Sequence, residues 1–415
     1  MSSAAAAAVA DAHRREWGFV LAATVRVTRD IDLAEECVQD AYAQALRVWD
    51  ERGVPARPAA WLTTTARNRA LDLLRRESTW RRLMPMVVED PVVDEPALGE
   101  DDEIPDDRLR LICTCCHPAL APEARVALTL RLLCGLTTAE VARAFLVSEP
   151  TMAARITRAK KKIAGARIPY RVPSAADLPA RIEAVLAVVH LVFTTGHSAP
   201  IGPELRRADL VERALDLARI LRRLLPDDAD VAGLLALILL TDARRATRTT
   251  EEGRLLLLAD QDRSKWDRAE IAEGVALVRE ALRRRPPGRF ALQAAIAAVH
   301  AESPTWADTD WAEIVALYDL LRQVWPSPVV ALNRAVAVGF ARGPSAGLAE
   351  LDALATEPQL AGYGYLAASR ADLLRRLGRT DEARLAYEEA LVLTGNEVER
   401  EFLKQRLAGM ARSVP

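Results

Sequence analysis

The side chains with the clearest chemical capacity are a threonine and four cations between residues 151 and 162. They follow one another mostly at intervals of three and four residues: Thr151, Arg155, Arg158 and Lys162, with Lys161 beside the last. That spacing places them on one face of a helix, and residues 150–171 hold seven Lys or Arg and no acid. Guanidinium and ammonium groups in such a row bind phosphates, and arginine also reads base edges. The pattern favours DNA binding; the alternative is a basic helix face that is only solvated.

Two short helices would have to hold this basic face. Thr137 stands three residues before Glu140, the spacing of a capping box, and predicts a helix that runs to about Phe145. Ser148 and Pro150 are typical of the first residues of a second helix. Its buried stripe would consist of four apolar residues: Met152, Ile156, Ala159 and Ile163. Two helices joined by a tight turn, the second one basic, predict a helix-turn-helix whose second helix enters the major groove.

A second group of polar and aromatic residues lies between residues 57 and 76. The glycine and two prolines of residues 53–58 predict a loop, and a helix is predicted from about residue 59 to residue 76. A protein that holds unstacked bases needs polar side chains, stackable rings and cations for the backbone. Residues of those types are Arg57, Trp61, Arg67, Asn68, Arg69, Arg75 and Arg76. Trp61 is equally compatible with a core position, and Arg75 and Arg76 are predicted to contact phosphate.

Composition indicates an all-α chain of several domains. The 415 residues exceed one ordinary core, and Ala, Leu and Arg dominate over β-branched and aromatic residues. The net charge is only −2, but residues 89–107 hold ten acids and no Lys or Arg, which predicts an extended acidic linker. The first residues lack the positive region of a signal peptide, and the longest apolar run, residues 231–240, is shorter than the roughly 20 residues that span a bilayer. A cytoplasmic protein without a membrane segment is expected.

The cysteines raise the question of a metal site. Cys113, Cys115, Cys116 and His117 are soft ligands, but their spacing does not match paired zinc ligands, and the only nearby cysteine is Cys134. Small buried side chains are the favoured interpretation, so neither a metal nor a cofactor is expected. Five cysteines in a chain of this length indicate a reducing compartment and not a disulfide framework.

The amino-terminal motifs resemble a known family. The segments Leu33-Ala-Glu-Glu-Cys-Val-Gln-Asp-Ala-Tyr and Ala66-Arg-Asn-Arg-Ala-Leu-Asp-Leu-Leu-Arg-Arg resemble region 2 of the extracytoplasmic-function (ECF) sigma factors of bacterial RNA polymerase. The helix-turn-helix resembles their region 4. The resemblance implies that residues 53–59, with Asn68, read a flipped base of the −10 element, and that the basic helix reads the −35 element. It also implies that residues 119–136 help region 4 dock on the β flap.

The helix that would bind core polymerase is predicted to begin near Asp32, with Glu35 as its capping partner. Three polar residues lie away from its apolar stripe: Gln39, Asp40 and Gln44. The resemblance assigns them to contact with the clamp helices of the β′ subunit.

Beyond residue 171, helices are predicted at residues 178–193, 204–225 and 230–241, and from residue 265 onward. Arg244, Arg245 and Arg248 form a dense cluster after the third of these helices. The cluster is compatible with binding of an anion or with internal pairing to Asp260 and Asp262, and internal pairing is favoured.

An internal repeat follows. Its members are small or aromatic residues 34 apart: Ala337, Phe340, Ala349 and Ala353 precede Ala371, Leu374, Ala383 and Tyr387. Thirty-four residues is the tetratricopeptide period. Stacked helical pairs of this kind offer a concave surface to a protein or peptide partner.

The sequence thus predicts five segments: region 2 (residues 11–82), an acidic linker (83–108), region 4 (109–168), a helical extension (174–285) and tetratricopeptide-like repeats (290–410). The whole resembles the ECF subgroup with such an extension, which implies a sigma factor that binds core RNA polymerase and promoter DNA and is regulated in cis. The alternative is a helix-turn-helix regulator that acts without polymerase. An enzyme is not expected, because the sequence contains no phosphate loop, catalytic triad or carboxylate pair.

Overall fold

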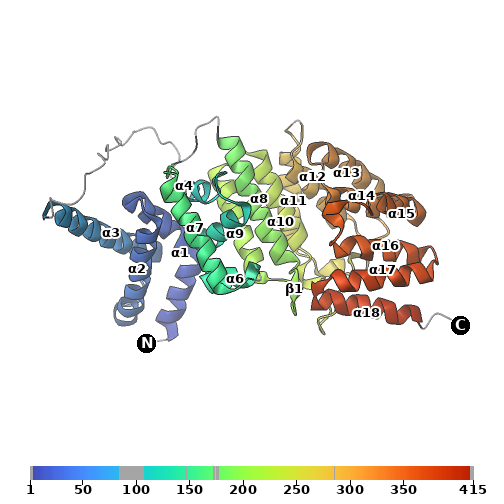
Figure 1. Cartoon of the computed structure of the whole chain (residues 1–415), viewed down its shortest axis with the longest axis horizontal. Coiled ribbons are helices and arrows are strands. Elements are labelled where there is room, and N and C mark those ends of the chain that lie inside the picture. Colours follow the sequence, from blue (N-terminus) through green and yellow to red (C-terminus); the bar gives the residue numbers. More distant parts are fainter. Residues whose placement is uncertain are drawn as a thin grey trace. The chain divides into compact units, whose positions relative to one another are not determined.

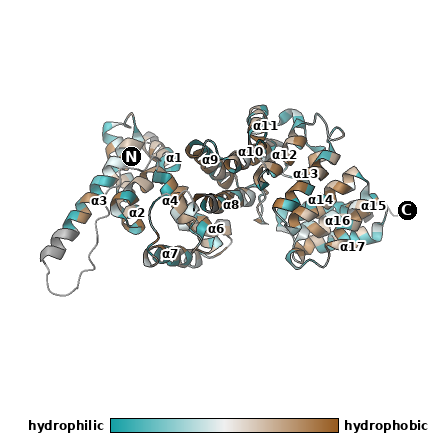
Figure 2. Cartoon of the chain, turned by 90° about the horizontal axis from the view of Figure 1, so that it is seen from above, coloured by the Kyte–Doolittle hydropathy of each residue, from teal (hydrophilic) through white to brown (hydrophobic). Residues whose placement is uncertain are grey.

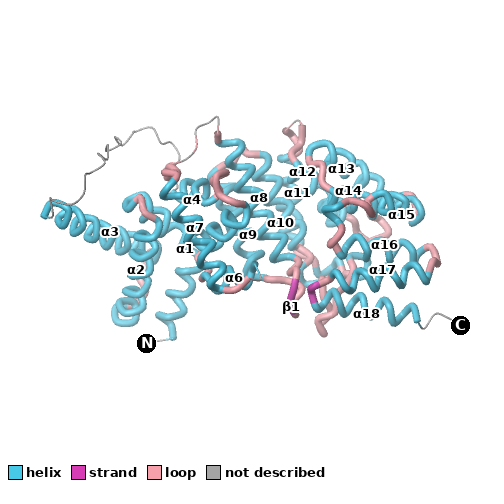
Figure 3. The backbone as a smooth tube through the Cα atoms, in the orientation of Figure 1, coloured by secondary structure: helices cyan, strands magenta, loops and turns pink. Residues whose placement is uncertain are grey.

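The computed structural model describes residues 3–83, 107–145, 147–171, 173, 177–284 and 286–411. These residues form an all-α structure, as predicted (Figure 3). The described strands have two residues each, β1 (Ile201–Gly202) and β2 (Gly395–Asn396), and pair in parallel. The predicted acidic linker lies almost entirely outside the described residues. The chain divides into two compact units, Met1–Val188 and Val189–Pro415, here called unit 1 and unit 2.

Unit 1 begins with three long helices (Figure 1): α1 (Ser3–Thr28), α2 (Ile31–Arg52) and α3 (Pro58–Leu83). Asp30 caps α2, because its carboxylate accepts a hydrogen bond from the backbone N–H of Leu33 at 2.9 Å. The predicted start of α2 near Asp32 is right to within one residue, but the capping residue is Asp30, so Glu35 is not the capping partner. The helix ends at Gly53, whose φ of 82° few other residues adopt, and Pro58 is the first residue of α3.

Five shorter helices complete most of unit 1: α4 (Asp107–Cys115), α5 (Pro122–Leu128), the π-helix η1 (Thr129–Leu133), α6 (Thr138–Phe145) and α7 (Glu149–Gly165). Of these, α4 and η1 pack directly against α1. A Cβ atom added to Gly18 would lie 2.5 Å from the carbonyl oxygen of Leu133, so only glycine allows α1 this close to η1. Beyond α7, the Tyr170 hydroxyl donates a hydrogen bond to the Ala22 carbonyl of α1 at 2.7 Å.

Helix α8 (Leu178–His197) runs from unit 1 into unit 2, which continues with α9 (Ala208–Leu224), α10 (Ala229–Asp242), α11 (Arg268–Ala281), α12 (Arg289–Glu302) and α13 (Trp311–Val324). Three 3₁₀ turns lie between α10 and α11: η2 (Arg245–Thr247), η3 (Leu258–Asp260) and η4 (Arg263–Lys265). The apolar run at residues 231–240 is buried all round, because α9, α11 and α12 surround α10. Figure 2 accordingly shows α10 as one of the most hydrophobic helices.

The remaining helices pack in sequence order: α14 (Pro328–Ala341), α15 (Pro344–Ala353), a 3₁₀ turn η5 (Pro358–Leu360), α16 (Gly364–Arg376), α17 (Thr380–Leu393) and α18 (Glu397–Ala411). Two similar helical pairs stand among them, α14 with α15 and α16 with α17. Their first helices begin 36 residues apart, at residues 328 and 364, and so do their second helices, at 344 and 380.

The residue equivalence predicted for these pairs is therefore shifted by two positions. Ala349 and Ala353 were matched with the buried residues Ala383 and Tyr387, yet both are exposed. At a spacing of 36, the matches are buried in both copies: Ala335 with Ala371, Gly347 with Ala383, and Leu351 with Tyr387. Gly347 allows the close contact of the first pair, because its added Cβ would lie 2.6 Å from the Gly339 Cα.

Candidate nucleic-acid interface

The turn before α7 has the local structure that the sequence predicts. The backbone N–H of Thr137 donates to the Glu140 carboxylate at 2.7 Å, and the N–H of Glu140 donates back to the Thr137 hydroxyl at 3.2 Å. This is the predicted capping box at the start of α6. Ser148 caps α7 by accepting a hydrogen bond from the N–H of Thr151 at 3.4 Å.

The side chains of α7 divide into a buried stripe and a cationic face. The stripe is the predicted one: Met152, Ile156, Ala159 and Ile163 are all buried. On the other face, the exposed residues are Thr151, Arg158, Lys161 and Lys162. Arg155 is only partly exposed, and its guanidinium carbon lies 5.7 Å from the centroid of the Phe145 ring. Stacking on that ring holds Arg155 at the edge of the cationic face.

Lys160 behaves differently from its neighbours, and sequence reasoning missed its role. Its ammonium group lies 2.6 Å from the Asp32 carboxylate and also forms an ion pair with Glu35, both on α2. Arg131 of η1 reaches Glu35 at 2.9 Å. Burial alone would lower the pKa of Lys160, but the carboxylates of Glu35 and Asp32 outweigh it and raise that pKa. Since Lys160 is four residues after Ile156, its position beside the buried stripe was the available signal.

The residues predicted to hold the −10 element lie along α3 and the loop before it. Arg57, Arg67, Asn68, Arg75 and Arg76 are exposed. The side chains of Arg67 and Asn68 are therefore accessible from solvent.

Trp61 takes an intermediate position. Its ring is partly buried and meets the ring of Trp49 edge to face, with centroids 5.7 Å apart. It thus packs against the α2–α3 interface and still presents some surface, so both interpretations of Trp61 survive.

The predicted polymerase-binding residues of α2, Gln39, Asp40 and Gln44, are exposed as well. One of them contacts a residue of the other predicted set: Arg69 of α3 donates a hydrogen bond to the Asp40 carboxylate at 2.9 Å. Arg69 is therefore partly neutralised, unlike Arg67.

Comparison with known protein families finds matches for two parts of unit 1. The family model described as Sigma-70 region 2 matches residues 13–79, and the one described as Sigma-70, region 4 matches residues 111–163. The chain thus contains regions 2 and 4 of a sigma-70 factor. Sigma factors with these two regions bind core RNA polymerase and promoter DNA in transcription initiation.

The sigma factor also matches a family beyond region 4. Residues 181–282 match a model described as a family of unknown function (DUF6596). An uncharacterized protein, R00370, of Rhizobium meliloti (strain 1021) is 42% identical over 395 residues, which cover 94% of this chain and 93% of that protein. The relative therefore shares unit 2 as well as the two sigma regions. Among the described residues of the sigma factor, no helix is long and apolar enough to cross a membrane.

The cysteines of the sigma factor are buried. All five are buried and none is in a disulfide, in agreement with the favoured interpretation of small buried side chains. Burial raises the pKa of Cys113 to about 12 and that of Cys116 to about 11, so both are thiols at neutral pH. His117 accepts a hydrogen bond through Nδ1 from the N–H of Ala119. No group of three metal-ligating side chains occurs in the part of the chain that the structure covers.

The arginine cluster after α10 departs from its prediction. Arg245 does form ion pairs, but with Asp242, Asp267 and Glu270 and not with Asp260 or Asp262. The Asp262 carboxylate instead accepts hydrogen bonds from the N–H and hydroxyl of Ser264, at the start of η4. Internal pairing was therefore correct for Arg245, but its partners were not, because the prediction considered only the acids of the loop after the cluster. The actual partners lie at the end of α10 and around the start of α11.

Proposed function

We propose that this sigma factor reads the −35 element with α7 and opens the −10 element with α3. The observation that carries the first part is the division of α7, which buries its apolar stripe while Thr151 and four cations, Arg155, Arg158, Lys161 and Lys162, lie opposite. A helix-turn-helix with this arrangement inserts its second helix in the major groove. Lys160 does not belong to the DNA-reading set, because Asp32 and Glu35 neutralise it.

On α3, exposed Arg67 and Asn68 contact the unpaired −10 strand, with Trp61 as a partly exposed ring for stacking. Exposed Arg57, Arg75 and Arg76 bind backbone phosphates. The exposed face of α2 formed by Gln39, Asp40 and Gln44 docks on the clamp helices of the β′ subunit, and region 4 docks on the β flap.

The protein is further proposed to be a cytoplasmic member of the ECF subgroup whose carboxy-terminal extension regulates it in cis. The two helical pairs with a 36-residue spacing support tetratricopeptide-like repeats within residues 290–410 and a protein or peptide partner. The proposal keeps the predicted segment ends: region 2 at residue 82, the acidic linker at 108, region 4 at 168 and the helical extension at 285.

The test is promoter selection from a pool of DNA fragments. The full chain is mixed with core RNA polymerase, and the retained fragments are sequenced. A preference for one −35 and one −10 motif is expected, and Arg158→Ala should relax only the −35 preference. The matched control is Lys404→Ala, which removes an exposed cation of α18 and should leave the selection unchanged. Selection of the same fragments without core polymerase would favour a regulator that acts independently of it.

The proposed regulation by the carboxy-terminal extension is tested by truncation. A chain that ends at residue 188 keeps unit 1 and removes unit 2. A changed level of promoter-specific transcription is expected, and unchanged transcription contradicts regulation in cis.

A further inference from the structure

The arginines around the end of α10 outnumber the carboxylates that they meet. Arg206 binds Asp242 at 2.7 Å, and Arg245 shares the same carboxylate and also pairs with Asp267 and Glu270. Those three acids are thus engaged by two of the arginines. Any further guanidinium in the cluster has to find a neutral acceptor or remain without a partner.

Two other arginines do find neutral acceptors. Arg263 donates hydrogen bonds to the carbonyl oxygens of His300 and Ser303, both at 2.6 Å. Arg248 donates to the carbonyl oxygen of His197 and to the Ser198 hydroxyl. These bonds fix the guanidinium groups in place, and more distant carboxylates offset part of their charges: Glu399 and Asp242 for Arg248, and Asp308 for Arg263.

Arg244 lacks even such partners. No hydrogen bond or ion pair within the described residues involves its guanidinium, although the side chain is only partly exposed. Burial, followed by repulsion from Arg248 and Arg263, lowers the pKa of Arg244 to about 10. A charge held this way destabilises the folded protein, and such a charge is typical of a binding site whose ligand supplies the opposite charge.

The Arg244 side chain lines a cavity of about 420 Å³, within the usual range for small-molecule sites. The walls come from α8, α10, α12, α13 and α14 and are largely apolar. Their aromatic members include Trp266, Tyr318 and Trp325, and no acid is among the described residues that line the cavity.

In the cavity wall, the Trp266 ring is held in place, whereas one nitrogen of His300 lacks a hydrogen bond. Trp266 is fixed by a hydrogen bond from its Nε1 to the Thr247 hydroxyl at 2.9 Å, and the Arg263 guanidinium carbon lies 4.8 Å from its ring centroid. His300 lines the same cavity, and its buried Nδ1 has no hydrogen-bond partner among the described residues. A preformed apolar wall beside one unpaired cation favours a ligand with an apolar body and one negative group.

We propose that this cavity binds a small aromatic carboxylate whose carboxyl group pairs with the Arg244 guanidinium. The planar fork of arginine matches the two oxygens of a carboxylate. A phosphate monoester would bring close to two negative charges, whereas the wall presents one guanidinium. Trp266, Trp325 and the aliphatic residues of α10 and α12 contact the ring.

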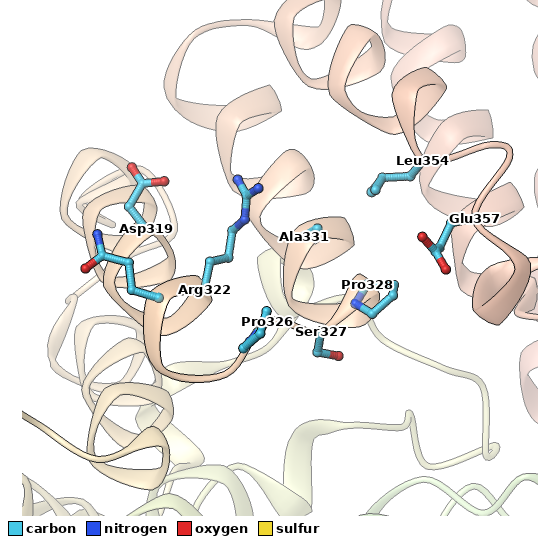
Figure 4. A pocket seen from close by; sticks show the side chains of 9 residues that line it. Asp319, Arg322, Pro326, Ser327, Pro328, Ala331, Leu354 and Glu357 are labelled. Carbon is cyan, nitrogen blue, oxygen red and sulfur yellow. The ribbon is translucent and has the colours of Figure 1, made fainter.

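A second hollow of unit 2 is larger but is lined by charges of both signs. In Figure 4, Asp319 and Arg322 lie on one side of it and Leu354 and Glu357 on the other. Its volume is about 520 Å³, but it carries both signs of charge, and Asp319 already pairs with Arg334 at 2.6 Å. Arg322 is exposed to solvent, which stabilises its charge without a ligand.

The test is calorimetric titration of the full chain, without polymerase or DNA, so that its outcome does not depend on the transcriptional role. The probes are 1-naphthoate, its neutral counterpart 1-naphthamide and inorganic phosphate. Stoichiometric binding of 1-naphthoate is expected, with affinity at least about tenfold above those of the other two. Arg244→Gln should remove that preference for the carboxylate, whereas Arg322→Gln, in the other hollow, should leave it unchanged.

A stability measurement separates this site from a structural role for Arg244. Without ligand, Arg244→Gln should have an unchanged or higher melting temperature, because it removes an uncompensated charge. A lower melting temperature would mark Arg244 as structural and overturn the proposal. The proposal would equally be overturned if 1-naphthoate failed to bind at about 1 mM, or if 1-naphthamide or phosphate bound as tightly.

Discussion

Two clusters of partly buried cations, one in each unit of this sigma factor, differ in their counter-charges. In unit 1, Lys160 and Arg131 meet the carboxylate of Glu35, and Asp32 adds a second acid. In unit 2, Arg244 stands beside Arg248 and Arg263 with no acid to pair with. Basic residues next to each other in sequence therefore differ in their surroundings: Lys160 links α7 to α2 through ion pairs, whereas Lys161 and Lys162 are exposed. The difference is that Lys160 has the carboxylates of Asp32 and Glu35 beside it.

The largest effect should come from breaking the paired cluster. Glu35 is 5% exposed, so Glu35→Ala leaves Lys160 and Arg131 without their shared buried acid. Unit 1 should lose about 3–5 kcal/mol of unfolding free energy, measured by urea denaturation of the full chain.

The matched control is Glu36→Ala, which removes the neighbouring exposed carboxylate and should change stability by less than about 0.5 kcal/mol. Equal effects of the two substitutions would mean that the Lys160 cluster contributes nothing to the packing of α7 against α2.

The next largest effect is expected from lowering the pH, which should destabilise unit 2. Burial lowers the pKa of His190 and of His300 to about 4, and nearby arginines add to both shifts. Because the folded pKa lies below the ordinary value of 6.5, the unfolded chain binds more protons between these values. The stability that these histidines contribute is complete above pH 6.5 and falls as the pH drops toward 4.

At pH 5 the expected loss of stability in unit 2 is about 1–2 kcal/mol for each of these two histidines, measurable by hydrogen exchange. His300→Gln should reduce the loss. Equal protection of the unit 2 amides from exchange at pH 7 and pH 5 would contradict the expected effect of these two histidines.

The local features of both units could be predicted from sequence. The capping box of Thr137 and Glu140 and the stripe of Met152, Ile156, Ala159 and Ile163 depend only on neighbours within a helix turn or two. The pairing of Lys160 with Glu35 could not, because those residues are 125 apart and meet only once α7 packs on α2. The spacing of 36 residues was misjudged as 34 because alanine also favours exposed helix positions, such as Ala349 and Ala353.

A smaller effect is expected from an exposed cation that meets DNA. Arg158→Ala should weaken affinity for the preferred −35 sequence by about 1–3 kcal/mol and should not change the unfolding free energy. Fluorescence anisotropy of the holoenzyme on labelled duplexes measures the loss. An equal loss on unrelated DNA would assign Arg158 to phosphate contact and not to base reading.

The smallest effect compares two adjacent arginines. Arg245→Gln breaks pairs with Asp242, Asp267 and Glu270 and should destabilise unit 2 by about 1–2 kcal/mol, because the group is partly screened by solvent. Arg244→Gln should not destabilise it. Thermal unfolding of both variants without added anion tests this difference, and a loss of stability in Arg244→Gln equal to that in Arg245→Gln would remove the contrast between the clusters.

The most direct test of the sigma-factor account is run-off transcription with purified core polymerase on a promoter obtained by selection. The full chain should yield one transcript of defined length, Arg158→Ala should yield clearly less, and Lys404→Ala should match the unaltered protein. Transcription that starts equally well without the chain, or a chain that fails to bind core polymerase, would contradict the account.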